Sequence, residues 1–530
     1  MIMIPNLMAS VANWNPQLIR ELKGRLKPRN ITLVSSVSLL SQALLIFFFY
    51  AQLPTEKSPY GRYVLDSKQL PIVIEWQTWW NDIFMTLNWI LPMALMLGGV
   101  YMLIQDLALE EKRGTLNFIR LSPQPGRDIL AGKLMGVPIL LYLGLSLALP
   151  LQIVVAINAQ IPMGLLLLQY GVFAIVAMSL FSLSLLLPLV GFAAGWLGAL
   201  IAVFIVFPSL QFFQLIFGVA RLANDNPNAW QDFNNRWDLW IKWFNIPVSY
   251  NIAAWYGFMS LSLVILMVGT WQVLNRRFSD PATTLLSKKQ SYLAVFSLNI
   301  FLLGFVTPIR STSWQDLGTF FLYGLIPWCL LLAIAALSPQ RQPLQDWARY
   351  RRESTRNHLK NRQLFQDLLW AEKSPNMLAI FANIMITIVL WTPWILTAKF
   401  KFNSYQSHQN WQVIFSLVLL GGLILICATV AQLILLNKII KPQLWAGGII
   451  LAILVFPFIS IVLMAIEPHQ YPLPFLLSFM PWATLESAQF IDFFLAIAIQ
   501  WTGLFLLNVK LHKNLLKAGE SQSKALLTNR

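Results

Sequence analysis

The sequence predicts an all-α polytopic membrane protein with about 12 transmembrane helices in two six-helix halves and with both termini in the cytoplasm. Of the 530 residues, 57% are hydrophobic and only 11% are charged, whereas a soluble chain has roughly 45–50% apolar and ~25% charged residues. The apolar residues gather in runs of about 20, the length that crosses a bilayer as a helix. These runs lack the alternation of barrel strands.

Residues 1–30 predict a cytoplasmic amphipathic segment ahead of the first span. Asn15 and Pro16 are typical of an N-cap and a first helical residue. Leucines then recur every fourth residue from Leu18 to Leu26, with basic residues on the other faces. This pattern favours a helix lying among lipid headgroups, although an ordinary basic flank of the first span is the alternative. Since no cleavable leader pattern precedes it, we expect the first span to be an uncleaved anchor.

Twelve apolar runs follow, six within residues 31–280 and six within 281–510, with a cytoplasmic tail over 511–530. The spans are expected near 31–51, 84–105, 134–157, 164–189, 192–219, 251–274, 291–308, 317–337, 377–398, 412–437, 447–466 and 489–508. The two halves share their order of short and long connections. Such a layout is typical of transporters built from parallel repeats.

The basic residues indicate the orientation of these spans. With the N-terminus inside, 29 of the 38 Lys and Arg residues fall in inside segments, while the 22 acids divide evenly. Basic residues retain loops in the cytoplasm, whereas acids contribute little. The formal net charge of +16 is thus explained by topology, and we expect a multi-pass protein of a bacterial plasma membrane with no nucleic-acid partner.

Catalytic motifs are missing from the sequence. Four histidines are scattered over loops and the tail, both cysteines lie in apolar runs, and there is no zinc-ligand spacing and no phosphate-binding GxxxxGK[ST]. We therefore expect no enzyme activity, catalytic residue, cofactor or metal in this chain. Ionisable residues such as Asp106, Glu467 and Asp492 fall near span ends, which weakens the case for ion-coupled transport without removing it, because backbone carbonyls also bind ions.

The segment from Glu110 to Lys133 contains the most informative pattern. Charges at its start are followed by a glycine break at Gly114, an apolar set and a stop at Pro123. This predicts a short cytoplasmic helix that packs on another surface, with a loop packed on its own bundle as the alternative. Gly132 and Gly136 then place small residues four apart, which permits close helix contact.

This run, E-x-x-x-G-T-L…L-S-P…I-L-x-G-K, resembles the loop between the second and third spans of ABC-2 type transporter permeases. The segment from Asn15 to Leu26 is similar to the elbow helix that precedes their first span. With the six-span layout, the resemblance covers residues of about 14–280.

The resemblance implies a membrane subunit that pairs with separate ATP-binding subunits, which bind ATP and Mg²⁺ outside this chain. Members of the family mostly export drugs, lipids, polysaccharides or ions. The implied ATPase-coupling loop comprises Glu110, Glu111, Arg113, Gly114, Thr115, Leu116, Leu121, Pro123, Gly132 and Lys133. Within it, Glu111, Arg113, Gly114 and Thr115 are the expected contacts.

The second half departs from this pattern. Trp370, Glu372, Lys373 and Pro375 stand where a second coupling loop belongs, but the G-T-L core is missing. The nearby basic stretch from Arg349 to Arg362 is either a solvated face drawn to anionic lipid headgroups or a docking site for the ATPase.

The leading hypothesis is thus the permease subunit of an ABC transporter, an exporter that works by alternating access in the lipid bilayer. An ion-coupled secondary transporter is the alternative. A membrane-embedded lipid-modifying enzyme ranks last, because the sequence offers no polar catalytic cluster at one membrane face.

Overall fold

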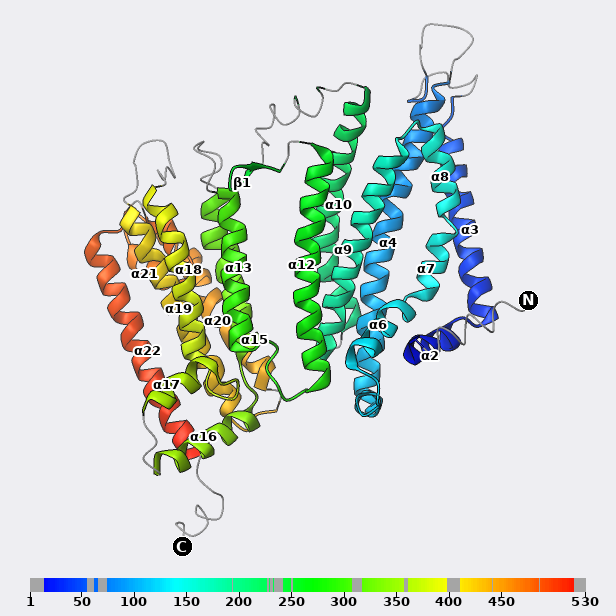
Figure 1. Cartoon of the computed structure of the whole chain (residues 1–530). Helices are drawn as coiled ribbons and strands as arrows, with labels where there is room; N and C mark the ends of the chain where they lie inside the picture. The colour runs from blue at the N-terminus through cyan, green and yellow to red at the C-terminus, as the bar shows by residue number, and fades with distance from the viewer. Residues whose placement is uncertain are drawn as a thin grey trace. The chain divides into compact units, whose positions relative to one another are not determined.

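The chain is a multi-span helical membrane protein (Figure 1). The computed structural model describes residues 14–54, 62–64, 74–192, 194–225, 228, 232, 242–248, 251–306, 317–356, 361–397, 410–440, 442–485 and 487–518. Within these ranges, 12 helices are long and apolar enough to cross a membrane. Strands β1 (Lys242–Trp243) and β2 (Ile246–Pro247) form a short antiparallel hairpin. The predicted all-α fold class is confirmed.

The chain divides into two compact units, with the boundary between Pro281 and Ala282 and the β1–β2 hairpin assigned to the second unit. Each unit contains six of the 12 candidate spans. The helices of unit 1 are α2 (Pro16–Arg25), α3 (Pro28–Tyr50), α4 (Trp76–Arg113), α5 (Thr115–Arg120), α6 (Gly126–Gly136), α7 (Ile139–Ser146), α8 (Leu149–Asn158), α9 (Met163–Leu189), α10 (Gly195–Asp225) and α12 (Ile252–Ser279).

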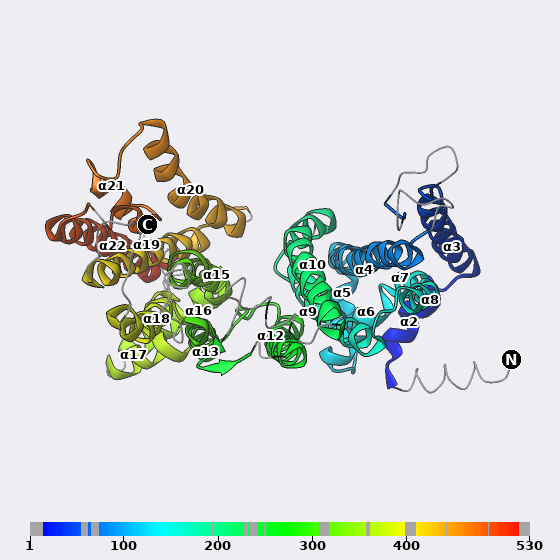
Figure 2. The same cartoon turned by 90° about the horizontal axis from the view of Figure 1, so that it is seen from above.

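Helix α4 is the centre of unit 1, where it packs against α8, α9 and α10. Gly99 of α4 lies against the ring of Phe181 on α9, and any side chain at Gly99 would overlap that ring. By contrast, α3 lies at the edge of unit 1 (Figure 2), and its apolar window has no buried residue. A helix that is apolar all round and unburied suits a lipid environment.

The third expected span, 134–157, is interrupted. Helix α6 ends at Gly136, and the apolar span consists of α7 and α8, from Ile139 to Asn158. Pro138 and Pro150 account for the breaks, because proline lacks the backbone N–H that continues a helix and its ring clashes with the preceding turn. Lys133 and its neighbours therefore belong to a separate helix ahead of the span.

Unit 2 is built around α19, whose apolar window is the most buried of the 12. Helices α18, α20 and α22 pack against it. The elements of unit 2 are α13 (Lys288–Val306), the π-helical turn η1 (Phe321–Leu325), α15 (Ile326–Leu337), α16 (Arg341–Arg356), α17 (Asn361–Trp370), α18 (Met377–Thr397), α19 (Asn410–Leu436), α20 (Pro442–Leu463), α21 (Pro472–Leu477), the 3₁₀ turn η2 (Pro481–Thr484) and α22 (Phe490–Ala518).

Buried polar side chains join α13 to α18 within unit 2. The Trp391 indole N–H donates to Asn299 Oδ1 over 2.8 Å, and Asn383 Nδ2 donates to Ser291 Oγ over 3.2 Å. Hydrogen bonds of this kind hold apolar helices together where lipid gives no hydrophobic drive for association.

Candidate functional site

The elbow segment forms a helix that docks on α6. Asn15 caps α2 by accepting from the Leu18 N–H over 3.0 Å, and Pro16 is the first helical residue. A Cβ at Gly132 would lie 2.9 Å from the Leu18 nitrogen, and one at Gly136 would lie 2.5 Å from Glu21 Cβ. The predicted close helix contact is therefore confirmed, and its partner is α2.

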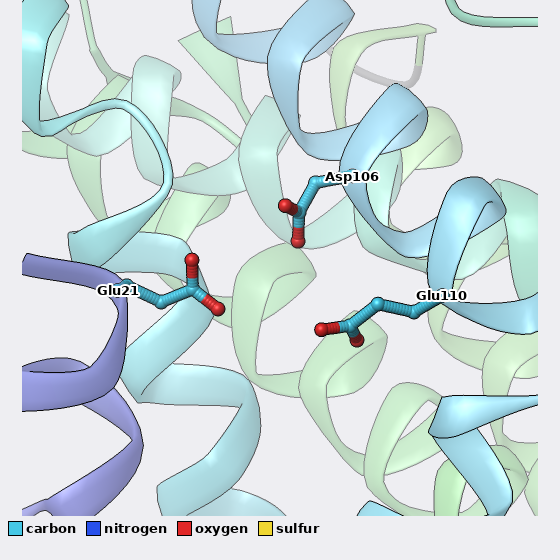
Figure 3. Close-up of side chains that lie close together, drawn as sticks. All are labelled: Glu21, Asp106 and Glu110. Atoms are coloured by element: carbon cyan, nitrogen blue, oxygen red, sulfur yellow. The ribbon is translucent and has the colours of Figure 1, made fainter. Parts of the chain in front are cut away.

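A buried ion-pair cluster joins α2, α4 and α6. Lys133 of α6 has no exposed surface. Its ammonium nitrogen lies 2.7 Å from Asp106 Oδ2, 2.8 Å from Glu110 Oε2 and 3.4 Å from Glu21 Oε1. Figure 3 shows the three carboxylates pointing toward one another from α2 and from two successive turns of α4. One lysine thus ties three helices together.

Two arginines of α2 complete the cluster. Arg25 pairs with both Asp106 and Glu21, and Arg20 lies 3.6 Å from Glu110. The cluster therefore contains three carboxylates and three cationic groups. This balance matters because a charge taken out of water needs partners to offset the loss of hydration.

The three carboxylates alone have the spacing of a metal site, since one oxygen of each lies within 4.8 Å of the others. Nζ of Lys133 forms ion pairs with all three carboxylates, so the cluster is satisfied by a cation of the protein itself. Burial on its own would lower the pKa of Lys133, but Asp106, Glu110 and Glu21 together raise that pKa above its ordinary value. The ammonium is charged at neutral pH.

Of the expected coupling residues, Lys133 therefore lies in the interior and Glu110 is partly buried. Gly132 is likewise covered by α2. These residues position the loop; they do not form its outer surface. The residues expected to make contact, Glu111, Arg113, Gly114 and Thr115, are all exposed.

The loop turns at Gly114, whose φ of +74° ends α4 and starts α5. Glycine adopts this left-handed conformation without the steric cost that a Cβ brings. On α5, Leu116 is 1% exposed and Phe118 is 83% exposed, and Leu121, directly after the helix, is 84% exposed. Leu116 and Leu121 were both expected in the coupling loop, but only Leu121 is exposed. Pro123 is also exposed.

We call the exposed surface formed by Glu111, Arg113, Thr115, Phe118 and Leu121 the α5 tip. It is held to the bundle on its other side, where the Arg120 guanidinium lies 5.4 Å from the ring centre of Phe278 at the end of α12. Phe118 was not among the expected site residues. Its one signal in the sequence is an aromatic side chain within a charged connector.

The second expected loop is built differently. Trp370 is half exposed, with its ring 5.6 Å from that of Tyr292, and Pro375 is buried. Lys288 at the start of α13 donates to the carbonyl of Leu368 over 2.6 Å and to the carbonyl of Pro375 over 3.1 Å. Lys288, which was not among the expected site residues, fastens this loop to its own unit.

Exposure also differs among the remaining residues of the second loop. Lys373 is exposed and Glu372 is partly buried. Of the basic stretch from Arg349 to Arg362, side chains 352–363 lie outside the described residues, as do residues 1–13 and the end of the expected tail, 519–530.

No family model, curated protein or solved structure matches this chain. The candidate site offers ion pairing and apolar contact at the α5 tip, on a support fixed by buried charges.

Proposed function

We propose that the chain is the permease subunit of an ABC transporter, an exporter whose alternating access is driven by separate ATP-binding subunits. The observation that carries the proposal is the α5 tip. Two large apolar side chains are more than four-fifths exposed outside the apolar spans, Phe118 on the short helix α5 and Leu121 directly after it. Exposed apolar groups rimmed by charges are typical of protein–protein contacts.

The helices behind the α5 tip are joined in a way that transmits a movement of the tip to the spans. Helix α4 has 38 residues and is therefore about 57 Å long, whereas the hydrocarbon core measures about 30 Å. Its end projects beyond the apolar span and carries Asp106 and Glu110 into the ion-pair cluster. A partner that moves α5 would thus move α4, α2 and α6 together.

The distribution of charge supports a cytoplasmic position for the tip, because positive-inside counting places residues 106–133 on that side. ATP-binding subunits are cytoplasmic. ATP binding to the partner would then favour one of two arrangements of the spans, and ATP hydrolysis would restore the other arrangement.

Copurification tests this function. The full chain, expressed with its genomic neighbours and solubilised in detergent, should bring down a subunit with a phosphate-binding GxxxxGK[ST] loop. The double substitution Phe118→Asp and Leu121→Asp should abolish copurification of that subunit, because burying two charges at the interface weakens binding by several kcal/mol.

Ile440→Asp is the matched control, since Ile440 is 87% exposed in a different connector. This variant should retain the partner. Recovery of no such ATPase by the wild-type chain, together with transport that follows an imposed ion gradient, would replace the proposal with ion-coupled transport.

A further inference from the structure

Unit 2 contains a cavity of about 670 Å³ between α16, α17, α18, α19 and α22. Its volume is within the range of small-molecule sites. Figure 1 shows α16 and α17 at the end of unit 2 where α22 finishes. The cavity therefore extends from the apolar helices α18, α19 and α22 to the helices α16 and α17 at the end of the unit.

The cavity changes character along its length. On α22 its wall includes Trp501, Leu504, Asn508 and His512, which recur every three or four residues and so share one face. From Trp501 to Leu516 the wall extends about 22 Å at 1.5 Å per residue. The polar members of this wall, Asn508 and His512, lie toward the end of the helix, where Leu511, Leu515 and Leu516 also line the cavity.

The other walls have the same polarity. Phe381 of α18 and Leu425 of α19 line the deep part, since both lie inside apolar spans. Arg351 of α16 lines the shallow part, together with Leu364 and Leu368 of α17. The lining residues, all within the described ranges, include no carboxylate.

Hydrogen-bond donors line the shallow part. Arg351 Nη1 lies 3.9 Å from Asp367 Oδ2, at the outer limit of an ion pair, and a guanidinium has five N–H donors. The indole nitrogen of Trp347, another lining residue, is buried and has no hydrogen-bond partner among the described residues. The shallow part is thus suited to an anion, and the deep part to a hydrocarbon chain.

We propose that this cavity binds an anionic phospholipid from the bilayer, with one acyl chain between α18 and α22 and the phosphate at Arg351 and His512. Basic pockets between helices at a membrane surface select anionic headgroups. Burial of the methylene groups of the acyl chain favours binding of a lipid over binding of a free headgroup. The proposal goes beyond the ABC function and does not depend on it.

Lipid binding to the full chain in detergent, followed by native mass spectrometry, tests the proposal. The probes are dioleoyl phosphatidylglycerol, dioleoyl phosphatidylcholine and glycerol 3-phosphate. Phosphatidylglycerol should bind about tenfold more tightly than phosphatidylcholine, because only the former has a net negative charge. Glycerol 3-phosphate should not bind measurably, because it lacks the acyl chains.

Variants locate the binding to the cavity. Arg351→Gln should remove most of the preference for phosphatidylglycerol, whereas the matched control Arg349→Gln, exposed on the same helix, should retain it. Leu378→Trp, which fills the cavity, should weaken the binding of both lipids. His512→Gln provides a second test of the headgroup site if Arg351→Gln does not fold.

Three results would overturn the proposal. Equal affinity for the two lipids would remove the anionic selectivity. Equal losses in Arg351→Gln and Arg349→Gln would indicate a general attraction of basic residues to the lipid surface. Binding of glycerol 3-phosphate as tight as that of the lipid would indicate a free-anion site.

Discussion

Lys133 is the residue on which the packing of α2, α4 and α6 depends. It has no exposed surface and lies within ion-pair distance of Glu21, Asp106 and Glu110. A buried pair contributes little compared with an apolar packing, but removing one partner leaves uncompensated charge. Here removal of the cation would leave three carboxylates facing one another.

Lys133→Met should therefore lower the free energy of unfolding by about 3–5 kcal/mol. Thermal unfolding of the detergent-solubilised chain measures the change. Lys112→Met is the control, because Lys112 is exposed near the same end of α4, two residues after Glu110, and it should shift the melting temperature little. Equal melting temperatures for the wild type and Lys133→Met would contradict the assigned role.

The pH dependence of this difference follows from the pKa of Lys133, which the carboxylates raise above its ordinary value against the effect of burial. A raised pKa contributes stability that is complete below the unfolded pKa of about 10.4. The contribution is lost as the pH rises through the higher folded pKa. Titration of Lys133 should therefore leave the difference in free energy of unfolding between wild type and Lys133→Met constant from pH 7 to about 9.5.

At the scale of elements, the contact between α2 and α6 depends on glycine. Gly136→Ala would place a Cβ 2.5 Å from Glu21 Cβ, and this atom cannot swing away as the tip of a side chain can. We expect a loss of about 1–3 kcal/mol from overpacking. Gly171→Ala on α9, where nothing lies within 4 Å, is the matched control.

Gly171→Ala should be neutral or slightly stabilising, since alanine favours helix more than glycine does by up to about 1 kcal/mol. Thermal unfolding of both variants provides the comparison. If Gly136→Ala behaves like Gly171→Ala, the close approach of α2 to α6 is wrong.

Local patterns predicted most elements, and tertiary contacts account for what they missed. Apolar runs located 12 spans, and Asn15–Pro16 located the start of α2. The pairing of Lys133 with Glu21 could not be read from the sequence, because 112 residues separate them. The orientation of Phe118 also escaped prediction, since α5 is too short for periodicity to distinguish its faces.

At the scale of the molecule, each of the two compact units contains six spans, and the positive-inside count predicts both termini in the cytoplasm. Single cysteines test this orientation after Cys329 and Cys427 are replaced by serine. In intact cells an impermeant maleimide should label Ile246→Cys on the exposed hairpin and should label Leu121→Cys only after lysis. Labelling of Leu121→Cys in intact cells would contradict this orientation and indicate the opposite one.

The central claim is that the α5 tip contacts an ATP-binding subunit. The most direct measurement is cross-linking of Phe118→Cys, in the background without native cysteines, to proteins coexpressed from neighbouring genes. We predict one major adduct, with a subunit that carries the GxxxxGK[ST] loop, and none from Gly164→Cys on α9, where the added side chain meets open space. An adduct of equal yield at both positions, or no adduct with such a subunit at Phe118, would contradict the account.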